Sequence, residues 1–193
     1  MYSRTGRAAG MFLLALVCGW WGARPAGAQS PPANFVALKS QMKVFEAVVD
    51  GNMAQVFAPP FGLLEKTLGT YLPGFGLAFS LEVNLYPSRS FTLFSPPSVA
   101  KDELKKTQRV KLERIAAVKE SVPRLLADHA SSLRGLAADD RVAIVVHLFR
   151  SQSEEDGLPL QLVIEARMSD LNLFWDRQIT YQQLLARITT LEL

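Results

Sequence analysis

Residues 67–86, TLGTYLPGFGLAFSLEVNLY, decide the fold class of this chain. Pro73 and Gly74 predict a type II turn, because proline presets the first central dihedral of such a turn and glycine supplies the positive φ of the second. After the turn, apolar and polar residues alternate from Gly76 to Tyr86, which is the period of a strand with one covered face. The stretch therefore predicts a hairpin with strands over residues 67–72 and 76–86.

The turn of this hairpin admits a second interpretation. Residues 71–76 combine aromatic side chains with Pro73, Gly74 and Gly76, and such a composition also suits a loop whose backbone approaches a ligand. We favour the plain turn, because the hairpin alone already requires the unusual dihedrals that these glycines supply.

A second hairpin is predicted further along the chain. Residues 141–150 are apolar on both faces, as in a central strand, and residues 158–168 alternate as their partner across the acidic turn 151–157. Between the hairpins, residues 99–136 form one long helical region that contains Pro123. We expect a kink there rather than a break, because the apolar stripe keeps its phase across the proline. The stripe consists of Leu112, Ile115, Val118 or Lys119, Val122, Leu126, His129, Leu133 and Leu136.

Helices are predicted at both ends of the domain. Residues 33–50 repeat apolar side chains at steps of three and four, and Gly51-Asn52 is expected to end that helix. Thr180 and Gln183 form the capping-box signature of a last helix over residues 181–188. Shorter helical segments are expected at residues 61–66 and 169–175. The predicted fold is α+β in the order α-β-β-α-β-β-α, with a four-stranded, largely antiparallel sheet made of the two hairpins.

The first 28 residues have the three-part layout of a secretory signal peptide. A basic start, an almost wholly apolar stretch over residues 8–22 and small residues up to Ala28 predict cleavage after Ala28 and export to the periplasm or beyond. Residues 29–193 are then expected to form a single compact α+β domain. The only cysteine, Cys18, lies in this leader, so the mature chain has no thiol for a disulfide or for catalysis. The arginines of the leader account for the formal net charge of +3, so the basic pI does not indicate nucleic-acid binding.

Polar residues of the predicted sheet offer one candidate site. If helices cover only one face, Glu82, His147 and Glu165 share the other, and two carboxylates with an imidazole can bind a divalent metal or perform acid–base chemistry. The alternative is an ordinary solvated face with cross-strand charge pairs. His129 on the long helix is a weaker candidate base, for which a satisfied structural histidine is the favoured interpretation. The sequence contains no recognised catalytic or phosphate-binding motif, and we predict no cofactor and no metal.

Two other surfaces are candidates for partners. Phe91, Leu93 and Phe94 lie in a proline- and serine-rich loop over residues 87–98, where exposed apolar side chains would mark a protein interface. Their alternative is to fold back under the long helix. The basic residues of the stretch 101–120 suit contact with anionic lipid, although a solvated helix face with internal ion pairs is the more usual explanation.

The sequence favours an exported, non-catalytic bacterial envelope protein that acts by binding another protein or by self-assembly. The grounds are the leader, the neutral mature chain and the lack of a convergent catalytic motif. The first alternative is a metal-binding protein or hydrolase-type enzyme that uses Glu82, His147 and Glu165. The second is a peripheral membrane-surface protein that uses the basic helix 101–120. No nucleic-acid partner is expected.

Overall fold

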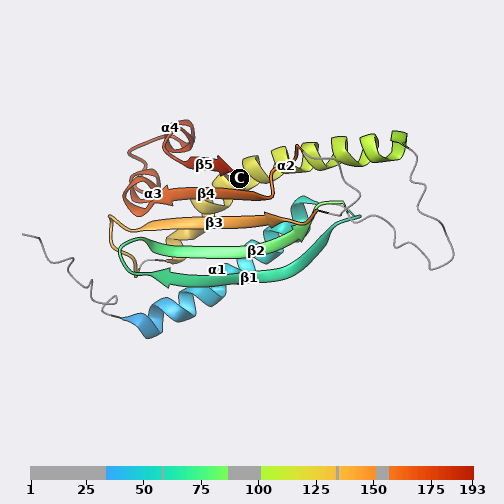
Figure 1. The fold of residues 1–193 in the computed structure, drawn as a ribbon. Helices are drawn as coiled ribbons and strands as arrows, with labels where there is room; N and C mark the ends of the chain where they lie inside the picture. Colours follow the sequence, from blue (N-terminus) through green and yellow to red (C-terminus); the bar gives the residue numbers. More distant parts are fainter. Residues whose placement is uncertain (1–33, 58, 87–100, 134, 151–156) are drawn as a thin grey trace, which may run out of the picture.

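The computed structural model describes residues 34–57, 59–86, 101–133, 135–150 and 157–193 (Figure 1). The predicted leader and the loop residues Phe91, Leu93 and Phe94 lie outside these ranges, so both stay predictions. In chain order the elements are α1 (Phe35–Val56), β1 (Gly62–Leu72), β2 (Gly76–Asn84), α2 (Lys101–His129), the 3₁₀ turn η1 (Ala130–Ser132), β3 (Arg141–Leu148), β4 (Gln161–Arg167), α3 (Met168–Trp175), α4 (Tyr181–Leu185) and β5 (Thr189–Glu192).

The five strands form one mixed sheet in the order β1-β2-β3-β4-β5. Both predicted hairpins are confirmed, because β1 pairs antiparallel with β2 and β3 pairs antiparallel with β4. The hairpins join through β2 and β3, which run parallel. The long helix α2 explains this direction, because a crossover of that length returns the chain to the end of the sheet at which β2 began.

The α+β class is therefore confirmed, but the predicted four-stranded sheet and the order α-β-β-α-β-β-α were wrong. The sheet is mixed rather than antiparallel because β2 and β3 pair parallel, and its fifth strand covers residues 189–192, for which no element was predicted. The predicted last helix is also shorter than expected. Its capping box at Thr180 and Gln183 is present, yet α4 ends at Leu185. The chain then extends as β5 along the free edge of β4, where the ladder satisfies the backbone groups that a longer helix would have paired. The helical turn predicted for residues 61–66 was wrong. These residues lie largely within β1, at the point where bulges shift its register with β2.

Helices α1 and α2 lie on the same side of the sheet, behind it in the view of Figure 1. The core is formed between these helices and the alternating apolar side chains of the central strands. Phe45 of α1 and Phe79 of β2 meet there with ring centroids 4.8 Å apart, and both side chains are fully buried. The residues predicted to face inward from the second strand are all buried, namely Leu77, Phe79, Leu81, Val83 and Leu85.

Helix α1 also secures the edge strand β1 through two carboxylates. Asp50 Oδ1 accepts hydrogen bonds from the Thr67 backbone N–H at 2.9 Å and from Thr67 Oγ1 at 2.6 Å. One helical turn away, Glu46 Oε1 accepts from the Gly69 N–H at 2.9 Å. These N–H groups belong to a strand that has a neighbour on only one side, so the helix both fixes β1 and blocks its free edge.

The helix boundaries depart from the prediction where tertiary packing outweighs local propensity. Gly51-Asn52 does not end α1, which continues to Val56 and buries Met53 completely. Helix α2 runs through Pro123 without a break, as expected from the unbroken phase of its stripe. The predicted stripe is confirmed at Ile115, Val118, Val122, Leu126 and Leu133, which are buried, but Leu112 and His129 are exposed and Lys111 is buried.

The turn between β1 and β2 has the predicted type II character. The Phe75 N–H donates to the Leu72 carbonyl at 3.0 Å, and Gly74 has φ 82°. Glycine is also required at position 76, because of both backbone conformation and space. Its φ is 122°, and a Cβ at this position would lie 2.2 Å from the carbonyl oxygen of Arg141. Only glycine therefore allows β2 to begin beside the start of β3.

We predict that Gly76→Ala destabilises the protein by about 2 kcal/mol or more, because it adds backbone strain and a clash with Arg141. Gly51→Ala is the matched control. It lies inside α1 with open space around it, and it should stabilise the protein by about 0.5–1 kcal/mol. Urea unfolding of both variants measures the two free energies. Equal effects would contradict the close approach of β2 and β3.

Asp50→Ala is expected to lower the free energy of unfolding by about 1–3 kcal/mol, because two donors of the buried Thr67 lose their acceptor. Asp128→Ala removes an aspartate from the exposed ion pair with Arg124, and such pairs contribute about 1 kcal/mol at most. A loss for Asp50→Ala no greater than that of the Asp128 control would show that α1 does not hold β1 in this way.

Candidate functional site

The second face of the sheet carries no helix of the described chain, and we call it the open face. The pairing of neighbouring strands fixes their register. The side chains of the open face therefore fall into rows that cross the sheet. The middle row, here called the apolar row, consists of Leu68, Ser80, Val145, Val163 and Leu191. Each member is the register partner of the next, so one side chain comes from every strand.

The apolar row is accessible to solvent. Leu68 is 60% exposed and Leu191 is 48% exposed, and Val145 and Val163 between them are half-buried. The adjacent row, on the side where β2 and β3 begin, consists of Thr70, Ala78, Ala143, Glu165 and Thr189. Its two central members are alanines, of which Ala143 is buried.

On the other side of the apolar row, the register forms an acidic row of Glu65, Glu82, His147 and Gln161. The parallel pairing of β2 with β3 places Glu82 directly beside His147. His147 Nε2 lies 3.1 Å from Ser80 Oγ, so this exposed imidazole already has a polar neighbour within the protein. A shallow hollow of about 500 Å³ lies over these residues and extends to Arg150.

The structure brings together two of the three residues of the predicted catalytic or metal site. Glu82 and His147 are register partners, but Glu165 pairs with Ala143, four residues from His147 along β3. At about 3.3 Å per residue this separation is roughly 13 Å, too far for one metal with ligand distances of about 2 Å. The expectation that Glu82, His147 and Glu165 converge was therefore wrong, because a face shared by three strands does not imply a shared row.

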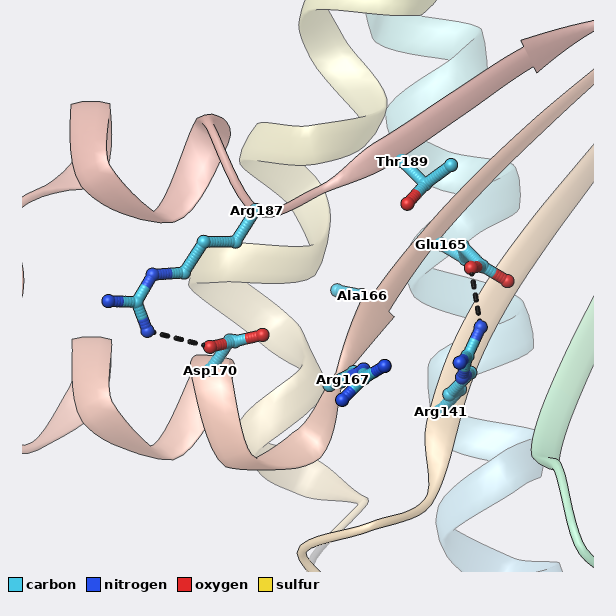
Figure 2. A pocket seen from close by; sticks show the side chains of 7 residues that line it. All are labelled: Arg141, Glu165, Ala166, Arg167, Asp170, Arg187 and Thr189. Atoms are coloured by element: carbon cyan, nitrogen blue, oxygen red, sulfur yellow. Dashed lines mark hydrogen bonds and ion pairs between the residues drawn. The ribbon is translucent and has the colours of Figure 1, made fainter.

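Glu165 belongs instead to a basic end of the open face, shown in Figure 2. Arg141 Nη1 pairs with Glu165 Oε1 at 2.8 Å, and Arg187 Nη1 pairs with Asp170 Oδ1 at 2.8 Å. Arg167 lies between these two ion pairs in the view of Figure 2 and is exposed. The three guanidinium groups line a hollow of about 520 Å³ and outnumber its two carboxylates.

Several polar side chains lie away from the open face, and one of them is the candidate base His129. Trp175 Nε1 donates to the Ala127 carbonyl at 2.7 Å, which satisfies a backbone oxygen in the last turn of α2. Nearby, burial raises the pKa of the Tyr181 phenol, although the Arg124 guanidinium over its ring opposes this shift. His129 is exposed on the helix layer, away from the open face.

The helix 101–120 is less uniformly basic toward solvent than its sequence indicates. Lys111 is buried, and Arg114 packs over the rings of Phe57 and Tyr86. The Arg114 guanidinium also donates to the carbonyl oxygens of Pro60 and Leu85, so it connects α2 to the segment before β1 and to the residue after β2. Lys111 and Arg114 therefore pack within the fold. They do not add to the exposed cations of the helix that could contact a lipid surface.

Sequence reasoning missed the apolar row. Its members occur singly in five strands, and no element was predicted for residues 189–192, so no local pattern linked Leu191 to Leu68. The Thr189–Glu192 segment has the β-branched threonines typical of a strand. That signal would have identified the fifth strand, but the register that aligns the row comes only from the pairing.

The register makes a prediction for metal binding. Gln161→His places an imidazole beside His147, which has Glu82 on its other side, with about 5 Å between neighbouring Cβ atoms. It should raise the affinity for Zn²⁺ at least tenfold over the parent chain. Glu165→His puts the same group in the wrong row and should leave the affinity unchanged. Calorimetric titration with Zn²⁺ compares the variants, and equal gains would contradict the register of β3 and β4.

No helix of the described residues has the length and apolar character needed to cross a membrane. Among the same residues, no group of three or more His, Cys, Asp or Glu side chains is arranged to hold a metal ion. Comparison of the chain with protein-family models, with curated proteins and with solved structures gives no match.

Proposed function

We propose that this chain is an exported, non-catalytic protein that acts by self-association, with a second copy of the chain bound to the open face of its sheet. The observation that carries the proposal is the apolar row, which crosses all five strands with Leu68 and Leu191 exposed at its two ends. Exposed apolar side chains rimmed by polar ones are typical of protein interfaces. The leader sequence supports export.

The shape of the face favours a second sheet as its occupant. Two sheets pack face to face with their strands within about 30° of each other and about 10 Å apart, provided that the contacting side chains are small or apolar. Five strands of 4 to 11 residues, about eight on average, give a face of roughly 500–600 Å², and two copies together cover roughly 1,000–1,200 Å². That area lies at the lower limit for specific interfaces, which predicts a reversible dimer.

The two side edges of the sheet are poorer candidates for assembly. The free edge of β1 is hydrogen-bonded to the carboxylates of Glu46 and Asp50. At the opposite side, β5 has only four residues, and short edge strands give few backbone hydrogen bonds to a partner. The open face therefore offers the larger continuous surface for a second copy.

The proposal predicts that Val163→Glu abolishes the dimer, because it buries a charge at the centre of the apolar row. Val44→Glu is the matched control, since Val44 is 58% exposed on α1 in the helix layer. Sedimentation velocity over a range of concentrations measures the dissociation constant of each variant, and thermal unfolding checks that both fold. A parent chain that stays monomeric at high micromolar concentration would overturn the proposal, as would equal weakening by both substitutions.

A further inference from the structure

We propose that the hollow at the basic end of the open face binds a phosphate group, carried either by a small soluble ester or by a lipid headgroup. The guanidinium groups of Arg141, Arg167 and Arg187 line this one hollow (Figure 2). They come from three places in the chain, namely the first residue of β3, the last residue of β4 and the segment between α4 and β5. The inference goes beyond the proposed self-association and does not depend on it.

The sheet places two of these arginines directly opposite each other. Arg141 and Arg167 are register partners in the antiparallel pair of β3 and β4, and the Cβ atoms of such partners lie about 4.5–5.5 Å apart. Like charges in this position destabilise a sheet. Glu165 compensates Arg141 at 2.8 Å, whereas Arg167 makes no ion pair with another described residue. An anion bound between the two arginines would remove the cost of this arrangement.

The other two arginines are held in place while most of their donors stay available. Arg141 and Arg187 each donate to a carboxylate through one nitrogen, Nη1, and a guanidinium carries several N–H donors. The side chains of the accepting Glu165 and Asp170 are only 20% and 18% exposed. Because these ion pairs already order both arginines, less conformational entropy is lost when a ligand binds to them.

The arrangement fits a phosphate group better than a carboxylate ligand. A carboxylate presents two oxygens in one plane, whereas a tetrahedral phosphate group can accept from guanidinium groups that approach from three elements. Three arginines against two carboxylates leave the hollow with a net charge of +1, which favours an anion. The hollow of about 520 Å³ lies in the size range of small-molecule sites, so it also has room for the group that carries the phosphate.

Calorimetric titration with inorganic phosphate at constant ionic strength tests the site. The parent chain should bind with a dissociation constant of about 1 mM or below. Arg141→Gln, Arg167→Gln and Arg187→Gln should each weaken binding about tenfold or more, because each removes charge-assisted hydrogen bonds to the anion. The matched control is Arg109→Gln, at an exposed position of α2 in the helix layer, which should bind phosphate like the parent.

Two of the effects cannot arise from a variant that fails to fold. Glu165→Gln removes a negative charge from the hollow but keeps an oxygen acceptor for Arg141, so it should tighten phosphate binding about threefold or more. Arg167→Gln relieves the like-charge pair, so without phosphate its midpoint of thermal unfolding should equal or exceed that of the parent. Added phosphate should then raise the midpoint of the parent and leave that of Arg167→Gln nearly unchanged.

Two further ligands distinguish the sources of the phosphate group. Glycerol 3-phosphate in solution is compared with vesicles of phosphatidylcholine and phosphatidic acid at the same phosphate concentration. Binding of the soluble ester assigns the site to a small phosphorylated molecule, and vesicle binding that Arg167→Gln abolishes assigns it to a lipid headgroup. If neither ligand binds, the proposal is wrong.

Other results would overturn the proposal as well. These are a parent chain that binds no inorganic phosphate at about 10 mM, arginine variants that bind like the Arg109→Gln control, and a Glu165→Gln variant without a gain in affinity. None of these outcomes affects self-association, which is measured separately through Val163→Glu.

Discussion

The parallel pairing of β2 with β3 is the contact on which the other features of this protein depend. It joins two hairpins that would otherwise be separate units, and it requires Gly76, where a Cβ would lie 2.2 Å from the Arg141 carbonyl oxygen. The helix α2 makes this pairing parallel by carrying the chain back across the sheet. Because β2 and β3 are central, their register sets the rows of the whole open face. Glu82 of the first hairpin lies beside His147 of the second for this reason.

A sheet with helices on one side has three surfaces through which it can associate, namely two edges and one face. In this protein the β1 edge is hydrogen-bonded to the carboxylates of α1, which removes it as a template for another strand. The β5 edge is short. The open face remains, and its centre carries side chains that gain by leaving water, while its charged groups lie toward the two ends. Such a distribution suits a contact in which apolar area supplies affinity and charge fixes orientation.

The same rows explain why the face is poorly suited to the chemistry first considered for it. Acid–base or metal chemistry requires side chains that converge on one point, and convergence in a sheet requires membership of one row or of adjacent rows. Glu165 shares a face with His147 but is paired with Arg141 at the other end. His147 is within hydrogen-bond distance of Ser80. Both groups thus have ordinary structural partners within the protein.

The sequence by itself determined the features that depend on local hydrogen bonds and periodicity. The turn at Pro73-Gly74, the alternating strand that follows it, the capping box of Thr180 and Gln183 and the continuation of α2 through Pro123 belong to this group, because each is set within a few residues. Tertiary structure decided the rest. Helix α1 continues past Gly51 because Met53 is buried in the core. Residues 189–192 form a strand because they pair with the free edge of β4. The rows of the open face were also beyond prediction, since register between distant strands depends on pairings that no single segment contains.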